Sequence, residues 1–255
     1  MFFVRHLLRT LLGCGLLALS GMASVDGAES SGLQGSAEDP LPTRLEQALN
    51  SAGGSGLTDL LAGEQALALQ NRYRIFSAQF PDARWSVREG AALEDGRQTF
   101  NIAVSGSQEQ GGVSYSLEAN QRLVLSTEAG RIVGQEVIGE QSVMRNTINP
   151  LPISLIIPDA VLTGSRYDVD VILDQPLGDA LVAGGLISLS PRQVQDQFSP
   201  DIQLEPLGGG GLFKSVKAPL LKGHQTWAAL LVHPDGLISV SKRVRVVDNK
   251  AALTP

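Results

Sequence analysis

The stretch "HPDGLISVSKRVRV", residues 233–246, decides how the end of this chain folds. It places a histidine beside an Asp-Gly pair and ahead of a Ser-x-x-Lys tetrapeptide, so its composition fits an active-site fragment as well as a turn between strands. Proline presets φ for a turn, and an Asp-Gly pair tolerates the turn and left-handed positions. We therefore predict that Pro234, Asp235 and Gly236 join two strands as a hairpin.

The Ser-x-x-Lys tetrapeptide runs from Ser239 to Lys242. In serine penicillin-binding enzymes this motif begins a helix, which brings the serine and the lysine to one face. Here it falls in an alternating run, where positions i and i+3 point to opposite faces of a strand. The accompanying Ser-Asp-Asn and Lys-Thr-Gly elements are also absent. We interpret the match as chance.

Short strand-like runs with turn signals between them fill the chain from residue 149 to residue 248. They are "ISLII", "YDVDVIL", "ALVAGGLISL", "IQLEPL", "LFKSVKAP", "TWAALLVH" and "LISVSKRVRVV", with at most a helical turn in "PRQVQDQF". Seven strands without a longer helix predict an immunoglobulin-like β-sandwich over residues 149–248, followed by a tail at 249–255. The Cys…Trp…Cys mark of antibody domains is absent, so the resemblance concerns architecture and leaves the topology open.

A domain boundary is predicted at "NTINPLP", residues 146–152, because its two prolines break any regular element. Upstream, Thr43 and Glu46 have the spacing of a capping box, so a helix is expected to begin there and to stop at "GGSG". A second helix is expected from near Thr58 toward Phe80, where Pro81 ends it.

From Trp85 onward the period changes to two, which predicts about four antiparallel strands joined by the hairpin loops "GSQEQGG" and "TEAGR". Residues 43–148 are thus a predicted α+β domain in which helices cover one face of a curled meander. The element order resembles that of cystatin-like and NTF2-like domains. The predicted fold class of the whole chain is mainly β with an α+β part.

Phe80 and Trp85 flank a turn in "FPDARW", where the helical region meets the sheet. Two interpretations stay open. The aromatic side chains can anchor the core of the domain, or they can line a pocket or interface if the sheet curls as in NTF2-like domains.

The first 42 residues are not predicted to belong to the fold. Basic residues, a short apolar run and small residues have the layout of a signal peptide over residues 1–23, and a polar, Gly- and Ser-rich tether is expected at 24–42. Whether the signal is cleaved or kept as an anchor stays open. The single cysteine, Cys14, lies inside this signal, so the exported chain is expected to form no disulfide, thiolate metal site or cysteine nucleophile.

Charge is distributed unevenly along this acidic chain. Residues 24–149 hold nine arginines, no lysine and sixteen acidic residues, a net charge of −7, whereas residues 150–248 hold eight basic and ten acidic residues, a net charge of −2. Every lysine lies beyond residue 213. No stretch is basic enough to predict binding to nucleic acid or to an anionic membrane surface, and no later segment is apolar enough to span a bilayer.

No metal site is predicted. His224 and His233 flank the strand-like "QTWAALLV", which puts them roughly 30 Å apart, whereas metal ligands lie within about 2.1 Å of the ion. Asp168, Asp170 and Asp174 share one face of a strand; calcium accepts such oxygens, but alternating aspartates also keep an outer strand face soluble.

Motifs of familiar catalysis or cofactor binding are missing. A phosphate loop requires a following helix, whereas the glycine run at 208–211 precedes a strand-like run and is predicted to be a flexible loop. The sequence contains no G-x-S-x-G, H-E-x-x-H or dinucleotide fingerprint, so neither a cofactor nor catalytic residues are predicted.

The leading hypothesis is an exported, non-catalytic interaction protein of the bacterial cell envelope, whose partner is an unidentified protein or envelope component. The alternative is a periplasmic carrier of small molecules or lipids on the concave face of the first domain, which would need an apolar pocket. An enzyme working through Glu136 and Glu140, on the last strand of that sheet, would need the two carboxylates to face each other in a cleft.

Overall fold

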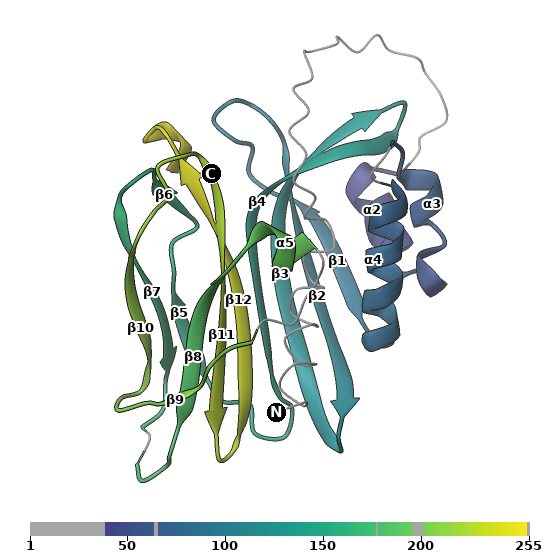
Figure 1. The fold of residues 1–255 in the computed structure, drawn as a ribbon. Helices are drawn as coiled ribbons and strands as arrows, with labels where there is room; N and C mark the ends of the chain where they lie inside the picture. Colours follow the sequence, from purple (N-terminus) through teal and green to yellow (C-terminus); the bar gives the residue numbers. More distant parts are fainter. Residues whose placement is uncertain (1–38, 64–65, 177, 196–200, 254–255) are drawn as a thin grey trace.

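The computed structural model describes residues 39–63, 66–176, 178–195 and 201–253. The predicted signal peptide and most of the predicted tether therefore lie outside the described residues. The chain is mainly β, with antiparallel sheets and a group of short helices at one side (Figure 1). Within the described ranges, no helix has the length and apolar character needed to cross a membrane.

In the described part of the chain, four helices precede the first strand. They are α2 (Leu41–Asn50), η1 (Ala52–Gly54), α3 (Leu57–Leu60) and α4 (Ala66–Gln79). The single helix predicted from Thr58 to Phe80 is wrong, because Leu61 is extended and Gly63 has φ +79°, which interrupts the helix before α4 begins.

The predicted capping box is also wrong. α2 begins at Leu41, two residues earlier than expected, and no side chain caps its first turn. The Glu46 carboxylate instead accepts the Val87 N–H at 2.7 Å, and Asn50 accepts the Trp85 N–H at 3.0 Å and donates to the Trp85 carbonyl at 2.8 Å. α2 thus covers the open edge of the first strand, which would otherwise expose unpaired backbone groups.

Four long antiparallel strands follow, as the period-two pattern predicts. They are β1 (Arg84–Glu89), β2 (Thr99–Gln110), β3 (Val113–Glu128) and β4 (Arg131–Asn146), paired in chain order. The helices pack on one face of this meander (Figure 1).

The remaining strands are β5 (Ile153–Ile156), β6 (Ala160–Leu162), β7 (Arg166–Leu173), β8 (Ala183–Leu189), β9 (Glu205–Pro206), β10 (Gly211–Lys217), β11 (Gly223–His233) and β12 (Gly236–Val247), with short helices α5 (Pro191–Gln195) and η2 (Ala251–Leu253). Six of the seven predicted runs form the expected strands. "IQLEPL" contributes only the two-residue β9, and β6 was not predicted because three residues are too few to show a period.

The hairpin at residues 233–236 is confirmed. β11 and β12 pair from Gly223↔Val246 to His233↔Gly236, and the buried His233 accepts the Asp235 N–H at Nδ1, 3.1 Å away. The histidine therefore stabilises the turn, and Ser239 and Lys242 lie in a strand rather than at the start of a helix.

Both halves of the chain contribute to one large sheet, ordered β1-β2-β3-β4-β12-β11-β8-β9, with β6 parallel to the end of β12. β4 and β12 pair from Arg145↔Ile238 to Glu140↔Arg243, and we call this ladder the seam. A second sheet, β10-β7-β5, packs against the part of the large sheet formed by β4, β12 and β11 through an apolar layer that includes Val143, Val171, Leu231 and Val240. The boundary predicted near Pro150 falls in the link from β4 to β5, and the division into two domains stays a prediction.

Candidate functional site

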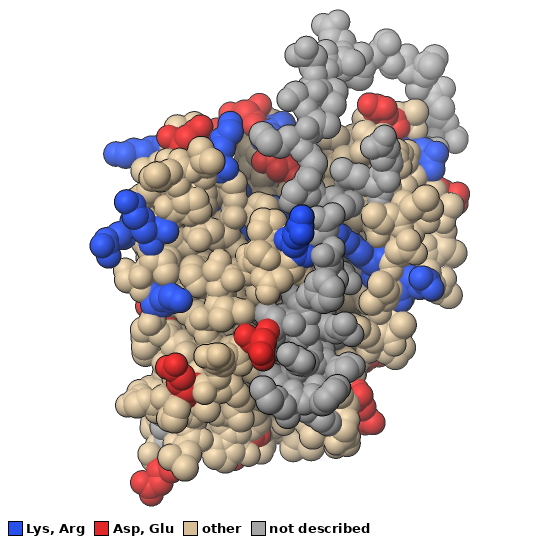
Figure 2. Space-filling model, in the orientation of Figure 1, with Lys and Arg blue, Asp and Glu red and all other residues tan. Residues whose placement is uncertain are grey.

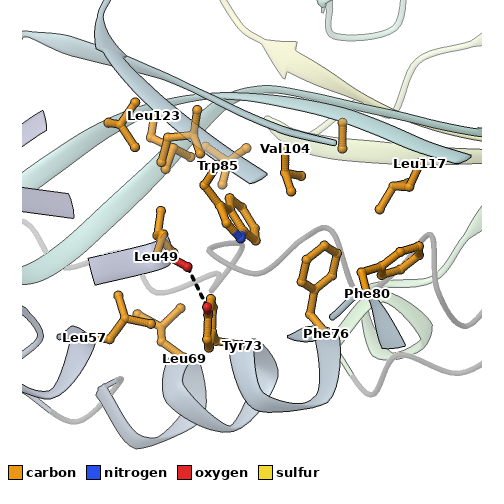
Figure 3. Close-up of a cluster of buried hydrophobic side chains, with 14 of the residues drawn as sticks. Leu49, Leu57, Leu69, Tyr73, Phe76, Phe80, Trp85, Val104, Leu117 and Leu123 are labelled. Carbon is orange, nitrogen blue, oxygen red and sulfur yellow. Dashed lines mark hydrogen bonds between the residues drawn. The ribbon is translucent and has the colours of Figure 1, made fainter. Parts of the chain in front are cut away.

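Phe80 and Trp85 lie in the core between the helices and the meander (Figure 3). Phe76 contacts both, with ring centroids 5.1 Å from Phe80 and 5.2 Å from Trp85. On the same helix as Phe76, the Tyr73 hydroxyl donates to the Leu49 carbonyl at 2.6 Å. These side chains fill the face that a carrier would use, and a hollow beside Leu69 and Ile132 of the same core measures only about 10 Å³.

A hollow of about 300 Å³ lies on the opposite face of the meander. Ile102 and Leu123 point toward the helices, so Asn101 and Arg122, their neighbours along the strands, point away. We call this cavity the polar hollow. It is lined by Asn101, Ile102, Ala103, Asn120, Gln121, Arg122, Ile138, Gly139, Glu140, Gln141, Asp159 and Lys242.

The polar hollow forms where β4 separates from β12. The β3–β4 register shifts at Ile138, and β4 leaves the seam beyond Glu140. Gly139 then lies opposite Arg122 without a side chain to fill the space, and Asp159, between β5 and β6, forms a wall on the other side. A register irregularity and a glycine thus produce an open depression in a sheet that is otherwise closely paired.

Charges around the polar hollow are held by protein partners. The ammonium of the buried Lys242 forms an ion pair with Asp159, and the Arg122 guanidinium donates to the Ala91 carbonyl at 2.9 Å and to the Thr99 hydroxyl at 3.2 Å. Because these cations already have acceptors, the amide side chains at 101, 120 and 141 are the groups most free to bind a ligand. An amide both donates and accepts hydrogen bonds, so this lining suits a neutral polar ligand.

The two glutamates that an enzyme would need lie on opposite faces. Their spacing of four gives them the same parity in a regular strand, but the irregularity at Ile138 breaks the alternation. Glu136 is opposite Val124 and pairs with Arg97 at 2.5 Å, whereas Glu140 is opposite Gln121 and points to the helix side. The two carboxylates therefore do not face each other in a cleft.

Glu140 belongs to a buried polar cluster on the helix side of the seam. Its carboxylate lies 4.0 Å from the Arg243 guanidinium and accepts a hydrogen bond from Gln121 at 3.1 Å, and both charged side chains are nearly buried. Burial raises the pKa of Glu140, although the charge of Arg243 opposes this shift. Two residues further along the seam, the hydroxyls of Ser142 and Ser241 are 2.7 Å apart.

His224 lies next to Arg243 on this side. Burial and then the charge of Arg243 lower its pKa from 6.5 to about 4. The imidazole is therefore neutral at neutral pH. His224 and His233 occupy the two ends of β11, and the described residues contain no group of three His, Cys, Asp or Glu side chains close enough to hold a metal ion.

The remaining candidates from the sequence are the aspartates on or directly after β7 and the glycine run at 208–211. Asp168 and Asp170 lie on the outer face of β7, and Asp174 accepts a hydrogen bond from Ser154 at 3.0 Å. The glycine run leads directly into β10, with Gly211 as its first residue.

Sequence reasoning missed the polar hollow. Asn101 and Asn120 alternate with buried residues on β2 and β3, which is also the pattern of any solvated strand face. Only the separation of β4 from β12 turns these residues into a depression.

The comparisons with known proteins add one match. The family described as "Domain of unknown function (DUF8623)" matches residues 148–247, which begin in the link after β4 and end with β12. No curated protein matches the chain. The matched segment overlaps the predicted sandwich, residues 149–248, whose limits and fold stay predictions.

Proposed function

We propose that this chain is an exported, non-catalytic interaction protein of the bacterial cell envelope, and that the polar hollow is its recognition site. The observation that carries the proposal is the lining. Three amide side chains and an internally neutralised Lys242–Asp159 pair surround an open depression of about 300 Å³. A partner segment rich in backbone amides or hydroxyls matches this lining better than an apolar or strongly charged ligand does.

The packing favours this function over the two others. The aromatic core fills the concave face that a lipid carrier would need, and Glu136 and Glu140 are on opposite faces. The second sheet packed on the first supports an immunoglobulin-like sandwich for residues 149–248, and the helices against the meander support a cystatin-like or NTF2-like arrangement for residues 43–148. Sandwich scaffolds commonly serve recognition.

The test is a co-purification of the chain, tagged at its C-terminus, after crosslinking in intact cells. A single partner at near-equal stoichiometry is the expected result. Gly139→Leu fills the floor of the polar hollow from a position where a Cβ meets nothing closer than 3.9 Å, and it should weaken capture by roughly tenfold or more.

Gly134→Leu is the matched control, because this glycine is on the same strand with similar room, 3.6 Å to the nearest atom, but outside the polar hollow. A partner that both variants retain equally would move the recognition site elsewhere. A monomer without any partner would exclude the interaction function.

A further inference from the structure

A second surface, on the loop between β10 and β11, is independent of the polar hollow. Leu220 and Leu221 are 77% and 81% exposed, although they are consecutive apolar residues. We call this pair the apolar tip. Single exposed leucines are common on proteins, but two adjacent ones projecting from a loop form a small apolar surface that water solvates poorly.

The base of this loop is held firmly. The Ala218 N–H donates to the Ser165 carbonyl at 2.8 Å, and the Gly164 N–H donates to the Pro219 carbonyl at 2.9 Å. Ala218 is itself buried. Because the base is hydrogen-bonded to the turn before β7, the loop projects the apolar tip outward instead of folding it onto the sheet.

Four basic side chains lie at the same end of the molecule as the apolar tip. Lys217 pairs opposite Arg166 at the same end of the second sheet, Lys222 follows the tip directly, and Lys250 follows β12 at this end; all four are exposed. The exposed acidic residues closest to them in the chain are Asp168 and Asp248, which leaves these six side chains with a net positive charge. Figure 2 shows blue side chains gathered at the left of the view, over the upper part of β7 and β10.

We propose that the apolar tip and its basic rim bind the surface of a bilayer that contains anionic phospholipid. The two leucines enter the boundary between headgroups and acyl chains, and the four cations interact with lipid phosphates. Charge complementarity selects this occupant. An apolar pair with cations at the same end of the molecule matches an interface that is apolar below and anionic above, whereas the chain as a whole has a net charge of −6.

The test uses the full chain with Cys14→Ser and Leu221→Cys, labelled at residue 221 with a polarity-sensitive dye. The matched control carries Leu181→Cys instead, because Leu181 is 89% exposed but follows β7 at the opposite end of the second sheet. Attachment through another part of the chain would be common to both labelled proteins, so a difference between them reports insertion of the tip.

Vesicles of phosphatidylcholine with roughly a third phosphatidylglycerol should shift the emission at residue 221 to the blue, and vesicles of phosphatidylcholine alone should do so weakly or not at all. The emission at residue 181 should not change. Lys217→Glu with Lys222→Glu should raise the lipid concentration at half saturation by about tenfold or more, and salt should have a similar effect.

Three results with vesicles would overturn the proposal. They are the absence of a shift at residue 221 on anionic vesicles, an equal shift at residue 181, and a shift that the double lysine variant leaves unchanged. A shift produced by lipid-free envelope protein but not by vesicles would assign the tip to a protein partner and would also overturn it.

Discussion

The helix-covered core and the seam occupy neighbouring parts of one sheet but are stabilised by different interactions. In the core, Phe76, Phe80 and Trp85 pack as an aromatic group with no polar partner needed, apart from the Tyr73 hydroxyl. In the seam, β4 and β12 meet through paired serines and a buried Glu140–Arg243 pair. The core gains stability from the apolar area it buries, whereas the helix side of the seam depends on the Glu140–Arg243 ion pair and on the contact between the two serine hydroxyls.

The largest expected effect is on the core side. Phe76→Ala removes a ring that is fully buried between Phe80 and Trp85, and we expect the free energy of unfolding to fall by about 3–5 kcal/mol. Denaturant unfolding measures this loss. Ile75→Ala, at an exposed position on the same helix, is the control and should change stability by less than about 0.5 kcal/mol. Equal stability of the two variants would contradict the packing described here.

On the seam side, the two partners of the ion pair should respond unequally. Glu140→Leu leaves the buried Arg243 charged, because an arginine does not lose its proton in proteins, and should cost about 3 kcal/mol. Arg243→Leu leaves Glu140, whose pKa burial already raises, and this carboxyl can take up a proton. That variant should cost about 1–2 kcal/mol.

The double variant Glu140→Leu with Arg243→Leu best distinguishes the stabilisation of the seam from that of the core. Replacing both charges with apolar side chains should bring stability back to within about 1 kcal/mol of the wild type. A double-mutant cycle on the free energy of unfolding measures the coupling. If the two single losses simply add, the pair does not stabilise the seam as a unit.

The last prediction is a pH dependence of stability that comes from His224, on β11 beside the seam. His224 has a pKa lowered to about 4 in the folded chain, so the unfolded chain binds a proton more readily between pH 6.5 and pH 4. Stability should therefore decrease as the pH falls through this window. We expect a loss of about 1–2 kcal/mol, because the ring is only partly buried and solvent screens part of the shift.

His224→Gln should flatten this part of the stability curve while leaving stability at pH 7.5 nearly unchanged. Urea unfolding at a series of pH values measures both effects. The variant His233→Gln is not a suitable control, because His233 accepts a hydrogen bond in the β11–β12 turn. Ile75→Ala serves instead, and its curve should keep the wild-type slope.

Patterns confined to one strand or turn were readable in the sequence. The Pro-Asp-Gly hairpin, the meander and most strands of the second half were predicted, because a turn needs only its own residues and a half-buried strand shows its two faces in its own alternation. The capping box failed for the converse reason. Glu46 has the right spacing for a local bond, but Val87, far along the chain, takes its carboxylate.

The candidate site could not be predicted from patterns within one strand or turn. Glu136 and Glu140 have the same parity in the sequence, and only the irregularity at Ile138 reveals that they face opposite ways. The lysines are sparse along the chain. The fold nevertheless brings Lys217, Lys222 and Lys250 to the end of the molecule that carries the apolar tip. The spacing of charged residues along the sequence therefore does not predict how closely they lie on the folded surface.

By itself, the sequence determined the mainly β class, the order of helices before strands in residues 43–148 and the final hairpin, since local backbone preferences and the two-residue period suffice for these. The tertiary structure alone decided that β4 pairs with β12, that this seam is polar on its helix side, and that a hollow opens where the two strands separate. The physical reason is the distance along the chain between the partners. The hydroxyls of Ser142 and Ser241 come into contact only in the folded sheet, and no period or motif in either segment predicts that contact.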